Sequence, residues 1–195
     1  MQLAQQLCTD QRPLAEYLEI AVAEIDQIAQ IISYFPALVR PQPETLALVN
    51  LNELTEDVLL IVDKVVTMSD IKLSWTLDSS LPLIPLDVKQ ISRALLSILL
   101  NAMQAMLQGG ALKVETFYDA SHEEVSVTIS DTGIGIAAEN LRQVFNPLFS
   151  TKEAGNGLGL TLANRVLQHH NGRIEVASEI GQGTTVRLCL PANNN

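Results

Sequence analysis

The sequence contains few of the residues that mark several common classes of protein. Only 12 of its 195 residues are Lys or Arg, against 22 Asp or Glu, and the net charge is −10. This balance argues against nucleic-acid binding, which requires clustered basic side chains to neutralise phosphates. The two cysteines, Cys8 and Cys189, lie near opposite ends and lack the spacing of metal ligands. We therefore expect reduced thiols rather than a disulfide framework or a zinc site.

Long hydrophobic runs are also missing. No segment reaches the roughly 18–20 consecutive apolar residues of a membrane span. The N-terminus lacks the basic start and apolar core of a signal peptide. Hydrophobic residues nevertheless make up 47% of the chain and charged residues 17%, a balance typical of a globular protein. We expect a cytoplasmic protein that makes no membrane contact.

The first part of the chain predicts one amphipathic helix. Its apolar residues recur at spacings of three and four: Leu14, Leu18, Ala21, Ile25, Ile28, Ile32 and Phe35. Such a helix needs a partner surface, which is either its own domain or another chain. Pro36 and the proline-rich stretch 40–44 then indicate a linker. We expect residues 1–42 to form a helical segment with its linker, and residues 43–195 to form a separate domain.

The second part alternates between strand and helix patterns. After a short extended piece at 46–51, Asn52 resembles the N-cap of a helix that runs to about Met68. The inward side chains of this helix would be Leu54, Val58, Ile61 and Val65. Further strands are predicted at 71–77, 112–118, 125–130, 173–178 and 184–190, and helices at 87–107, closed by Gly109-Gly110, and at 158–170. Together these elements predict a two-layer α/β sandwich, an α+β arrangement.

A first glycine-rich turn follows the strand at 125–130. Asp131 stands at the end of this strand, and Gly133 and Gly135 allow the backbone to approach a flat ligand. A carboxylate in this position can accept a hydrogen bond from an exocyclic amine such as that of adenine. One alternative is an ordinary turn. Another is a dinucleotide-binding fold, since residues 133–138 fit G-x-G-x-x-A, but Pro147 interrupts the helix which that motif requires.

A second glycine-rich turn leads directly into the predicted helix at 158–170. It comprises Gly155, Gly157, Leu158 and Gly159. Backbone amides at such a helix start, together with the helix dipole, favour phosphate oxygens. Lys152 precedes the turn and is a candidate for contact with the β- or γ-phosphate, although a solvated surface lysine is the simpler alternative.

Two further features belong to the same predicted pocket. Asn101 carries a carboxamide in an otherwise apolar helix, and its oxygen is a suitable ligand for Mg²⁺. Its alternative role is an asparagine bonded within the core or at the helix surface. Phe145 and Phe149 lie between the two glycine turns on a loop that suits a lid over a bound ligand. They would otherwise simply anchor a long loop.

Together these motifs resemble the catalytic ATP-binding region of bacterial sensor histidine kinases, in the group shared with DNA gyrase and the mismatch-repair MutL proteins. The resemblance extends from about Leu14 to Pro191. It implies a Bergerat-type ATP-binding fold with ATP and Mg²⁺ as ligands. By this resemblance Asn101 is the magnesium ligand, Asp131 reads adenine, and Thr184, which follows Gly183 in a third glycine box, supports the adenine contact.

The remaining motif positions are implied in the same way. Phe145 and Phe149 match the phenylalanine box of the family's lid, and Lys152 matches its phosphate-contacting lysine. Gly155, Gly157 and Gly159 match the second glycine box. The segment from Glu16 to Phe35 resembles the second helix of the dimerisation and histidine-phosphotransfer hairpin of nitrogen-regulator-type kinases, which implies a homodimer.

The sequence departs from the family pattern in two places. Ser97 occupies the position where many members have a second asparagine, one turn before the magnesium ligand. The phosphoacceptor motif is absent. His122 lies in a polar turn, and His169 and His170 lie at a helix end, where we expect them to cap the helix dipole or face solvent. This chain alone is therefore not expected to phosphorylate itself.

The expected function is histidine protein kinase activity delivered to another molecule. The chain would bind Mg-ATP and transfer the γ-phosphate to a histidine-containing phosphotransfer helix supplied elsewhere, with a response regulator as the downstream partner. One alternative is an ATP-binding regulatory or anti-sigma-type protein that uses the same pocket without histidine kinase activity or acts on serine. A structural interaction domain with a degenerate pocket is the third possibility.

Overall fold

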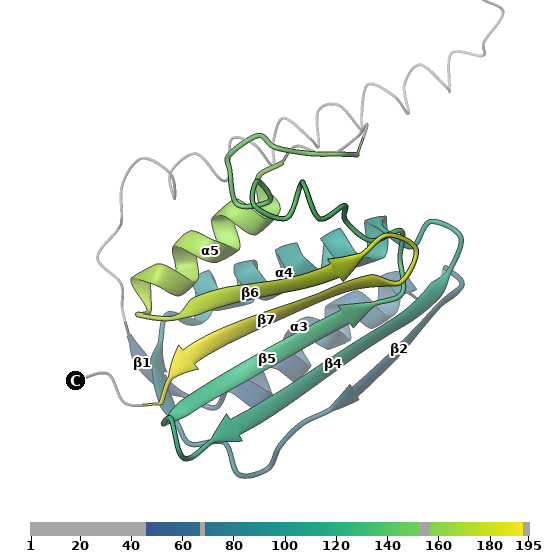
Figure 1. Cartoon of the computed structure of the whole chain (residues 1–195). Coiled ribbons are helices and arrows are strands. Elements are labelled where there is room, and N and C mark those ends of the chain that lie inside the picture. Colours follow the sequence, from purple (N-terminus) through teal and green to yellow (C-terminus); the bar gives the residue numbers. More distant parts are fainter. Residues whose placement is uncertain (1–45, 67–68, 153–156, 193–195) are drawn as a thin grey trace, which may run out of the picture. The chain divides into compact units, whose positions relative to one another are not determined.

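The computed structural model shows a five-stranded sheet covered on one face by helices (Figure 1). The structure describes residues 46–66, 69–152 and 157–192, all within the unit Gln42–Asn195. The predicted helix at 14–35, the linker after it and Gly155 lie outside the described residues. Within the described part, the two-layer α/β sandwich expected from the sequence is confirmed.

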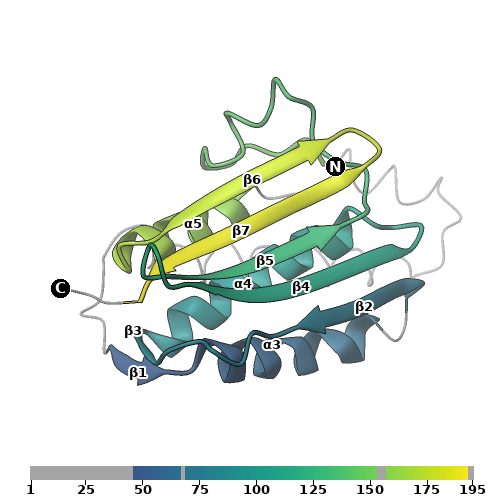
Figure 2. The same cartoon turned by 60° about the horizontal axis from the view of Figure 1, so that its bottom comes forward.

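The main sheet is mixed, with the order β2-β4-β5-β7-β6 (Figure 2). Its strands are β2 (Ile71–Thr76), β4 (Gly110–Asp119), β5 (Glu124–Asp131), β6 (Arg173–Glu179) and β7 (Gly183–Pro191). Strand β2 runs parallel to β4, and the other neighbouring strands are antiparallel. The central position of β5, between β4 and β7, fixes the end of this strand beside the start of β7.

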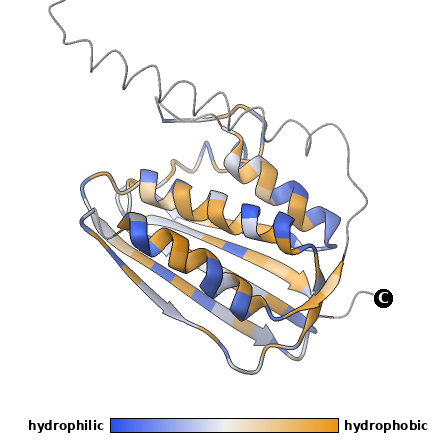
Figure 3. Ribbon diagram, turned by 180° about the vertical axis from the view of Figure 1, so that it is seen from behind, coloured by the Kyte–Doolittle hydropathy of each residue, from blue (hydrophilic) through white to orange (hydrophobic). Residues whose placement is uncertain are grey.

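Three helices of the described part cover the inner face of this sheet: α3 (Leu51–Val66), α4 (Val88–Gln104) and α5 (Gly159–His169). Each helix carries both apolar and polar surfaces (Figure 3). Their apolar sides meet inward-facing strand residues, and the most deeply buried side chains include Ile98 and Leu99 of α4, Leu167 of α5 and Leu112 of β4. Burial of this apolar surface is the main stabilising contribution to the fold. None of the described helices has the length and apolar character required of a membrane span.

The start of α3 differs from the prediction. Asn50, not Asn52, caps the helix, because its Oδ1 accepts the Asn52 N–H at 3.0 Å. Asn52 instead bridges to the sheet: its Nδ2 donates to the Asp78 carbonyl at 2.8 Å, and its Oδ1 accepts from Thr116 Oγ1 at 2.7 Å. Both residues are asparagines two positions apart, so the local sequence alone does not distinguish the cap from the bridge.

The predicted inward face of α3 is correct at Leu54 and Val58 but wrong at Ile61, which is 58% exposed. The buried stripe includes Leu59 and Val62. Successive residues of a helix are 100° apart, so the observed buried stripe is rotated toward Leu59 relative to the predicted one. Ile61 therefore lies at the edge of the buried stripe. The Val65 side chain lies outside the described residues.

Two further boundaries differ. Helix α4 begins as predicted, with Asp87 as N-cap, but it ends at Gln104 with Ala105 as C-cap, so Gly109-Gly110 does not close it. Gly109 instead approaches Asp70, whose carbonyl would lie 2.6 Å from a Cβ at that position.

Strand β3 (Ile84–Leu86) was not predicted, because Pro85 lies inside it. It pairs with β1 (Ala47–Val49), the short extended piece expected from the sequence, in a separate two-stranded sheet.

Of the two roles expected for His170, at the helix end or facing solvent, the second is wrong, because the residue is buried with 2% of its surface exposed. Its Nδ1 faces the Val166 carbonyl at 2.8 Å, and its Nε2 accepts the Asp87 N–H at 3.0 Å. Because Nε2 faces a donor, the ring proton lies on Nδ1. The His170 ring thus caps the last turn of α5 and joins it to the residue that caps the start of α4.

Candidate functional site at the end of β5

Asp131 ends β5 at the point where β7 begins, and its side chain is held by the backbone. Its Oδ1 accepts the Gly133 N–H at 2.8 Å and the Thr184 N–H at 3.3 Å. No hydrogen bond to Oδ2 is made within the described residues, although only 9% of Asp131 is exposed. The arrangement fixes the carboxylate in one orientation and leaves one oxygen available to a ligand.

The first glycine turn lies against the C-terminal end of α4. The Ile134 N–H donates to the Ala105 carbonyl at 3.1 Å, and a Cβ at Gly133 would come within 2.6 Å of that carbonyl oxygen. Gly135 has φ +70° and stands equally close to the Glu179 backbone. Glycine is therefore required here by close backbone approach, as the sequence suggested.

Thr184 pairs with Asp131 across β5 and β7, and with Ser178 across β7 and β6. Paired residues on neighbouring strands point to the same face, so Asp131, Thr184 and Ser178 form one row. Thr184 is 9% exposed, and its Oγ1 lies 2.9 Å from Ser178 Oγ. The structure thus places Thr184 beside Asp131, as predicted for a residue that supports the same ligand contact.

Asp131 and Lys152 are both perturbed by burial. Burial raises the pKa of Asp131, and hydrogen bonds from the Gly133 and Thr184 N–H groups and the charge of Lys152 oppose this shift. Burial lowers the pKa of Lys152, and the charge of Asp131 opposes it. Lys152 Nζ donates to the Asn101 backbone carbonyl at 2.9 Å, in the last turn of α4. For both side chains, burial disfavours the charged form more than the hydrogen bonds and the opposite charge nearby favour it.

The Asn101 side chain faces the start of α5. A Cβ at Gly159 would lie 2.6 Å from Asn101 Nδ2 and 2.9 Å from Ser97 Oγ, so these two polar groups of α4 occupy the space that the glycine leaves. Ser97 is buried and lies one turn before Asn101 on the same helix face. Among the described residues, no group of three His, Cys, Asp or Glu side chains gathers to hold a metal. Amide and hydroxyl oxygens such as those of Asn101 and Ser97 are groups that hard cations accept as ligands.

The second glycine turn joins the lid to α5. Gly157, with φ +63°, accepts the Leu148 N–H at its carbonyl at 3.1 Å. Leu158 precedes the first residue of α5 and is 4% exposed, so its side chain belongs to the core. Helix α5 begins at Gly159, beside Asn101, and the first N–H groups of a helix have no partner within the helix itself.

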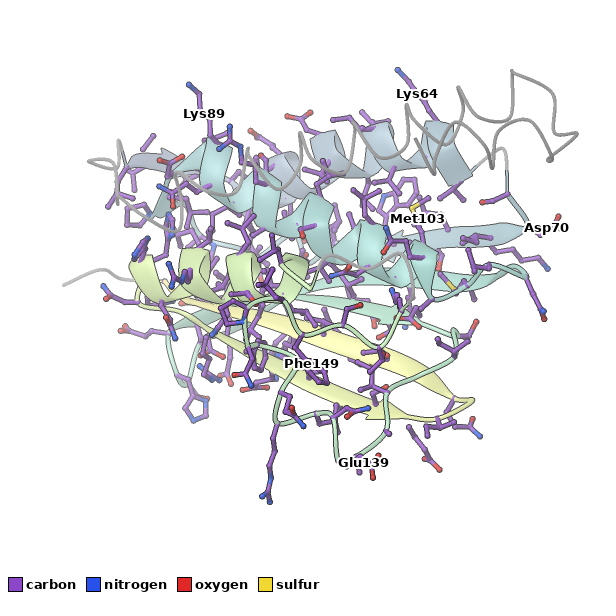
Figure 4. All side chains as sticks on the ribbon, turned by 90° about the horizontal axis from the view of Figure 1, so that it is seen from above. Lys64, Asp70, Lys89, Met103, Glu139 and Phe149 are labelled. Atoms are coloured by element: carbon purple, nitrogen blue, oxygen red, sulfur yellow. The ribbon has the colours of Figure 1, made fainter. Side chains whose placement is uncertain are left out.

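The lid between the glycine turns is a series of short turns that is anchored to α5. Thr161 of α5 donates through Oγ1 to the Phe145 carbonyl at 3.1 Å. Phe145 and Phe149 are both half-buried. In Figure 4, Phe149 is drawn over the strands of the sheet, whereas Glu139, on the same connecting segment, lies at the rim of the view. The bond from Thr161 thus anchors the loop to α5 through the Phe145 backbone.

Two side chains of the site escaped the sequence reasoning. Thr161 is a buried hydroxyl in the apolar first turns of α5, and this polarity was a signal that could have identified it. Ser178 contacts both the first glycine turn and Thr184, but its partners are distant in sequence. Only the register of β6 against β7 reveals it.

Known proteins resemble this chain in sequence and in fold. Residues 86–194 match the model of a family described as histidine kinase-, DNA gyrase B- and HSP90-like ATPases. The sensor histidine kinase ZraS of Escherichia coli strain K12 is 36% identical over 175 residues, which cover 90% of this chain and 37% of ZraS.

Two solved structures share the fold. The full-length kinase ShkA in complex with AMPPNP has a TM-score of 0.78 at 22% identity, over 90% of this chain and 37% of ShkA. The histidine kinase ThkA in complex with the response regulator TrrA has a TM-score of 0.80 at 21% identity, over 94% of this chain and 53% of that one. The family match and the geometry at Asp131 agree: the chain belongs to the histidine kinase-, DNA gyrase B- and HSP90-like ATPases.

Proposed function

We propose that this chain binds Mg-ATP and acts as the catalytic part of a two-component sensor histidine kinase. The observation that supports the proposal best is the buried Asp131 carboxylate, with Oδ1 fixed by two backbone N–H groups and Oδ2 left for a ligand. An ionised carboxylate only accepts hydrogen bonds, so its natural partner is an exocyclic amine. The 6-amino group of adenine provides one.

The opposite side of the pocket suits the phosphates. The start of α5 supplies backbone N–H groups, and Lys152 supplies a positive charge that can leave the Asn101 carbonyl for a phosphate oxygen. Asn101 would hold the Mg²⁺ that accompanies ATP, since its carboxamide lies beside the start of α5 together with the Ser97 hydroxyl. The ion would neutralise phosphate charge. Lys152, the α5 amides and the lid would orient the γ-phosphate.

The phosphate acceptor is proposed to lie outside the described residues. A histidine nitrogen on a phosphotransfer helix would form the new P–N bond while the bond to the β-phosphate breaks and ADP leaves. His170 is buried and bonded at both ring nitrogens, so it is not that acceptor. Because ThkA was solved in complex with a response regulator, we further propose a response regulator as the partner of this chain. From the sequence pattern we propose that residues 1–42 form part of a dimerisation and phosphotransfer hairpin with its linker, and that the protein is a cytoplasmic homodimer.

Calorimetric titration tests the binding part of the proposal. Mg-ADP should bind the wild-type chain at one site, and binding should compete with AMPPNP. A titration without heat, confirmed by equilibrium dialysis, would contradict nucleotide binding.

A transfer assay tests the kinase part. The chain is incubated with γ-labelled Mg-ATP and, as a separate polypeptide, a histidine-bearing hairpin from a sensor histidine kinase such as ZraS, with a hairpin in which glutamine replaces that histidine as the control. We expect acid-labile label on the first hairpin only. Acid-stable label would indicate a serine acceptor instead, and ATP binding without transfer to hairpins from several such kinases would reject the kinase activity.

A further inference from the structure

Ser178 of β6 connects the two backbone segments that surround Asp131. Its Oγ accepts the Ile136 N–H of the first glycine turn at 2.8 Å, lies 2.8 Å from the Gly183 carbonyl, and lies 2.9 Å from Thr184 Oγ1. The Ile134 carbonyl also accepts the Gly181 N–H at 2.9 Å. The glycine turn is therefore joined to the β6–β7 hairpin on both sides of Gly135.

The hydrogen-bonding capacity of a serine hydroxyl fixes the direction of these contacts. A hydroxyl has one proton to donate and two lone pairs to accept with. The Ile136 N–H uses one lone pair, and the Gly183 carbonyl can only accept, so it takes the Ser178 proton. Ser178 Oγ then has one lone pair left, so Thr184 Oγ1 must be the donor in the hydrogen bond between the two hydroxyls.

This direction determines what Thr184 presents to the pocket. With its proton committed to Ser178, Thr184 Oγ1 offers only lone pairs, as does the ionised Asp131 carboxylate beside it. Two neighbouring acceptors favour a ligand edge rich in donors. A carbonyl placed at the same position would meet lone pairs and lose its hydrogen bonds.

We propose that Ser178 is a positioning residue that selects a 6-amino purine over a 6-oxo purine, by holding the Thr184 hydroxyl as an acceptor. The proposal rests on the proposed nucleotide binding and specifies its base selectivity. Ser178 acts through Thr184 and the first glycine turn, without touching the base. Removal of its hydroxyl frees the Thr184 proton, which can then rotate and donate to a 6-oxo group.

The test compares Mg-ADP with Mg-IDP, which carries a 6-oxo purine, by calorimetry. Wild-type protein should bind ADP more tightly. In Ser178→Ala the ratio of the two affinities should fall by up to about tenfold, the effect of one neutral hydrogen bond. Ser178→Thr keeps the hydroxyl and should retain the wild-type ratio. In a Thr184→Ala background, Ser178→Ala should change the ratio little.

Ser130 provides a matched control. Its Oγ lies 3.0 Å from Thr185 Oγ1 in the same β5–β7 pair, one position along each strand and thus on the opposite face of the sheet. Ser130→Ala removes one hydroxyl of an equivalent hydroxyl–hydroxyl contact and should leave the ADP/IDP ratio unchanged.

The outcomes separate the two proposals. If wild-type protein prefers ADP and Ser178→Ala keeps the same ratio, the role of Ser178 is refuted while nucleotide binding stands. Equal wild-type affinity for ADP and IDP would also refute it. If wild-type protein binds neither, the proposed function itself has failed. An equal fall of the ratio in Ser130→Ala would show general loosening of the sheet and overturn the specific role.

Discussion

Replacement of Asp131 by asparagine should weaken nucleotide binding without destabilising the fold. The variant keeps the shape of the side chain, but its two terminal atoms are no longer equivalent. The Gly133 and Thr184 N–H groups both donate toward Oδ1, so the amide oxygen must occupy that position. The amide NH₂ then points to where Oδ2 faced the ligand. A donor is thereby placed against the donor amine of the base.

The expected size of the effect follows from the bond that is lost. A hydrogen bond to a charged group contributes about 1.5–3 kcal/mol net. Since 1.4 kcal/mol corresponds to a factor of ten, ADP should bind about 10- to 100-fold more weakly. Stability should move the other way, because burial raises the pKa of Asp131, which means that the folded state disfavours the charged form. A neutral amide avoids that penalty, so Asp131→Asn should unfold at the same or a higher urea concentration.

Asp131→Ala supplies the contrast, because it removes Oδ1 and leaves the Gly133 and Thr184 N–H groups without the acceptor they share. We expect this variant to lose both affinity and stability. Calorimetry with Mg-ADP and urea unfolding followed by circular dichroism measure the two quantities. The reasoning is refuted if Asp131→Asn binds ADP within about twofold of wild type, or if its stability falls as far as that of Asp131→Ala.

The remaining predictions concern pH, the proposed metal ligand and the core. Burial raises the pKa of Asp131 above its usual 3.8, so the carboxyl stays protonated to a higher pH in the folded state than in the unfolded state. The contribution of Asp131 to the free energy of unfolding therefore declines as the pH rises from 3.8 through the raised pKa. ADP affinity should fall as pH is lowered through the same window, and this component should be missing from Asp131→Asn; identical profiles would contradict it. Gly159→Ala should displace the Asn101 side chain, which lies 2.6 Å from the added Cβ, and titrations with and without EDTA should show loss of the Mg²⁺-dependent part of binding only. His170→Ala should lower the free energy of unfolding by about 1–3 kcal/mol, since the Asp87 N–H loses its acceptor, whereas Ala at the exposed Gln168 should change it by less than about 0.5 kcal/mol.

The parts of the site that local sequence determines were predictable. Asp131 follows a strand whose alternation is strong, and the glycines around it are needed at close approaches that tolerate no Cβ. The helix start at Gly159 and the polar Asn101 in an apolar helix carry signals of the same local kind. Each of these predictions used only a few consecutive residues. In the structure, the residues concerned lie near one another at one end of the sheet.

The parts that depend on long-range pairing were not predictable. Asn50 and Asn52 have the same chemistry, and only the distant partners Asp78 and Thr116 give Asn52 its bridging role. His170 looked like a surface histidine at a helix end until α4 supplied the Asp87 N–H. Strand β3 contains a proline and becomes a strand only because β1 pairs with it.

The electrostatics of the pocket give one reason why a nucleotide suits both of its ends. Burial raises the pKa of Asp131 and lowers that of Lys152, so each charged form is disfavoured by loss of water. In the structure Lys152 donates to the Asn101 carbonyl, where the C-terminal end of the α4 dipole attracts a cation. A ligand with a donor amine at one end and phosphates at the other supplies a partner to Asp131 and an anion to Lys152. Binding of such a ligand relieves both penalties at once, whereas a purine without phosphates, or a phosphate alone, relieves only one.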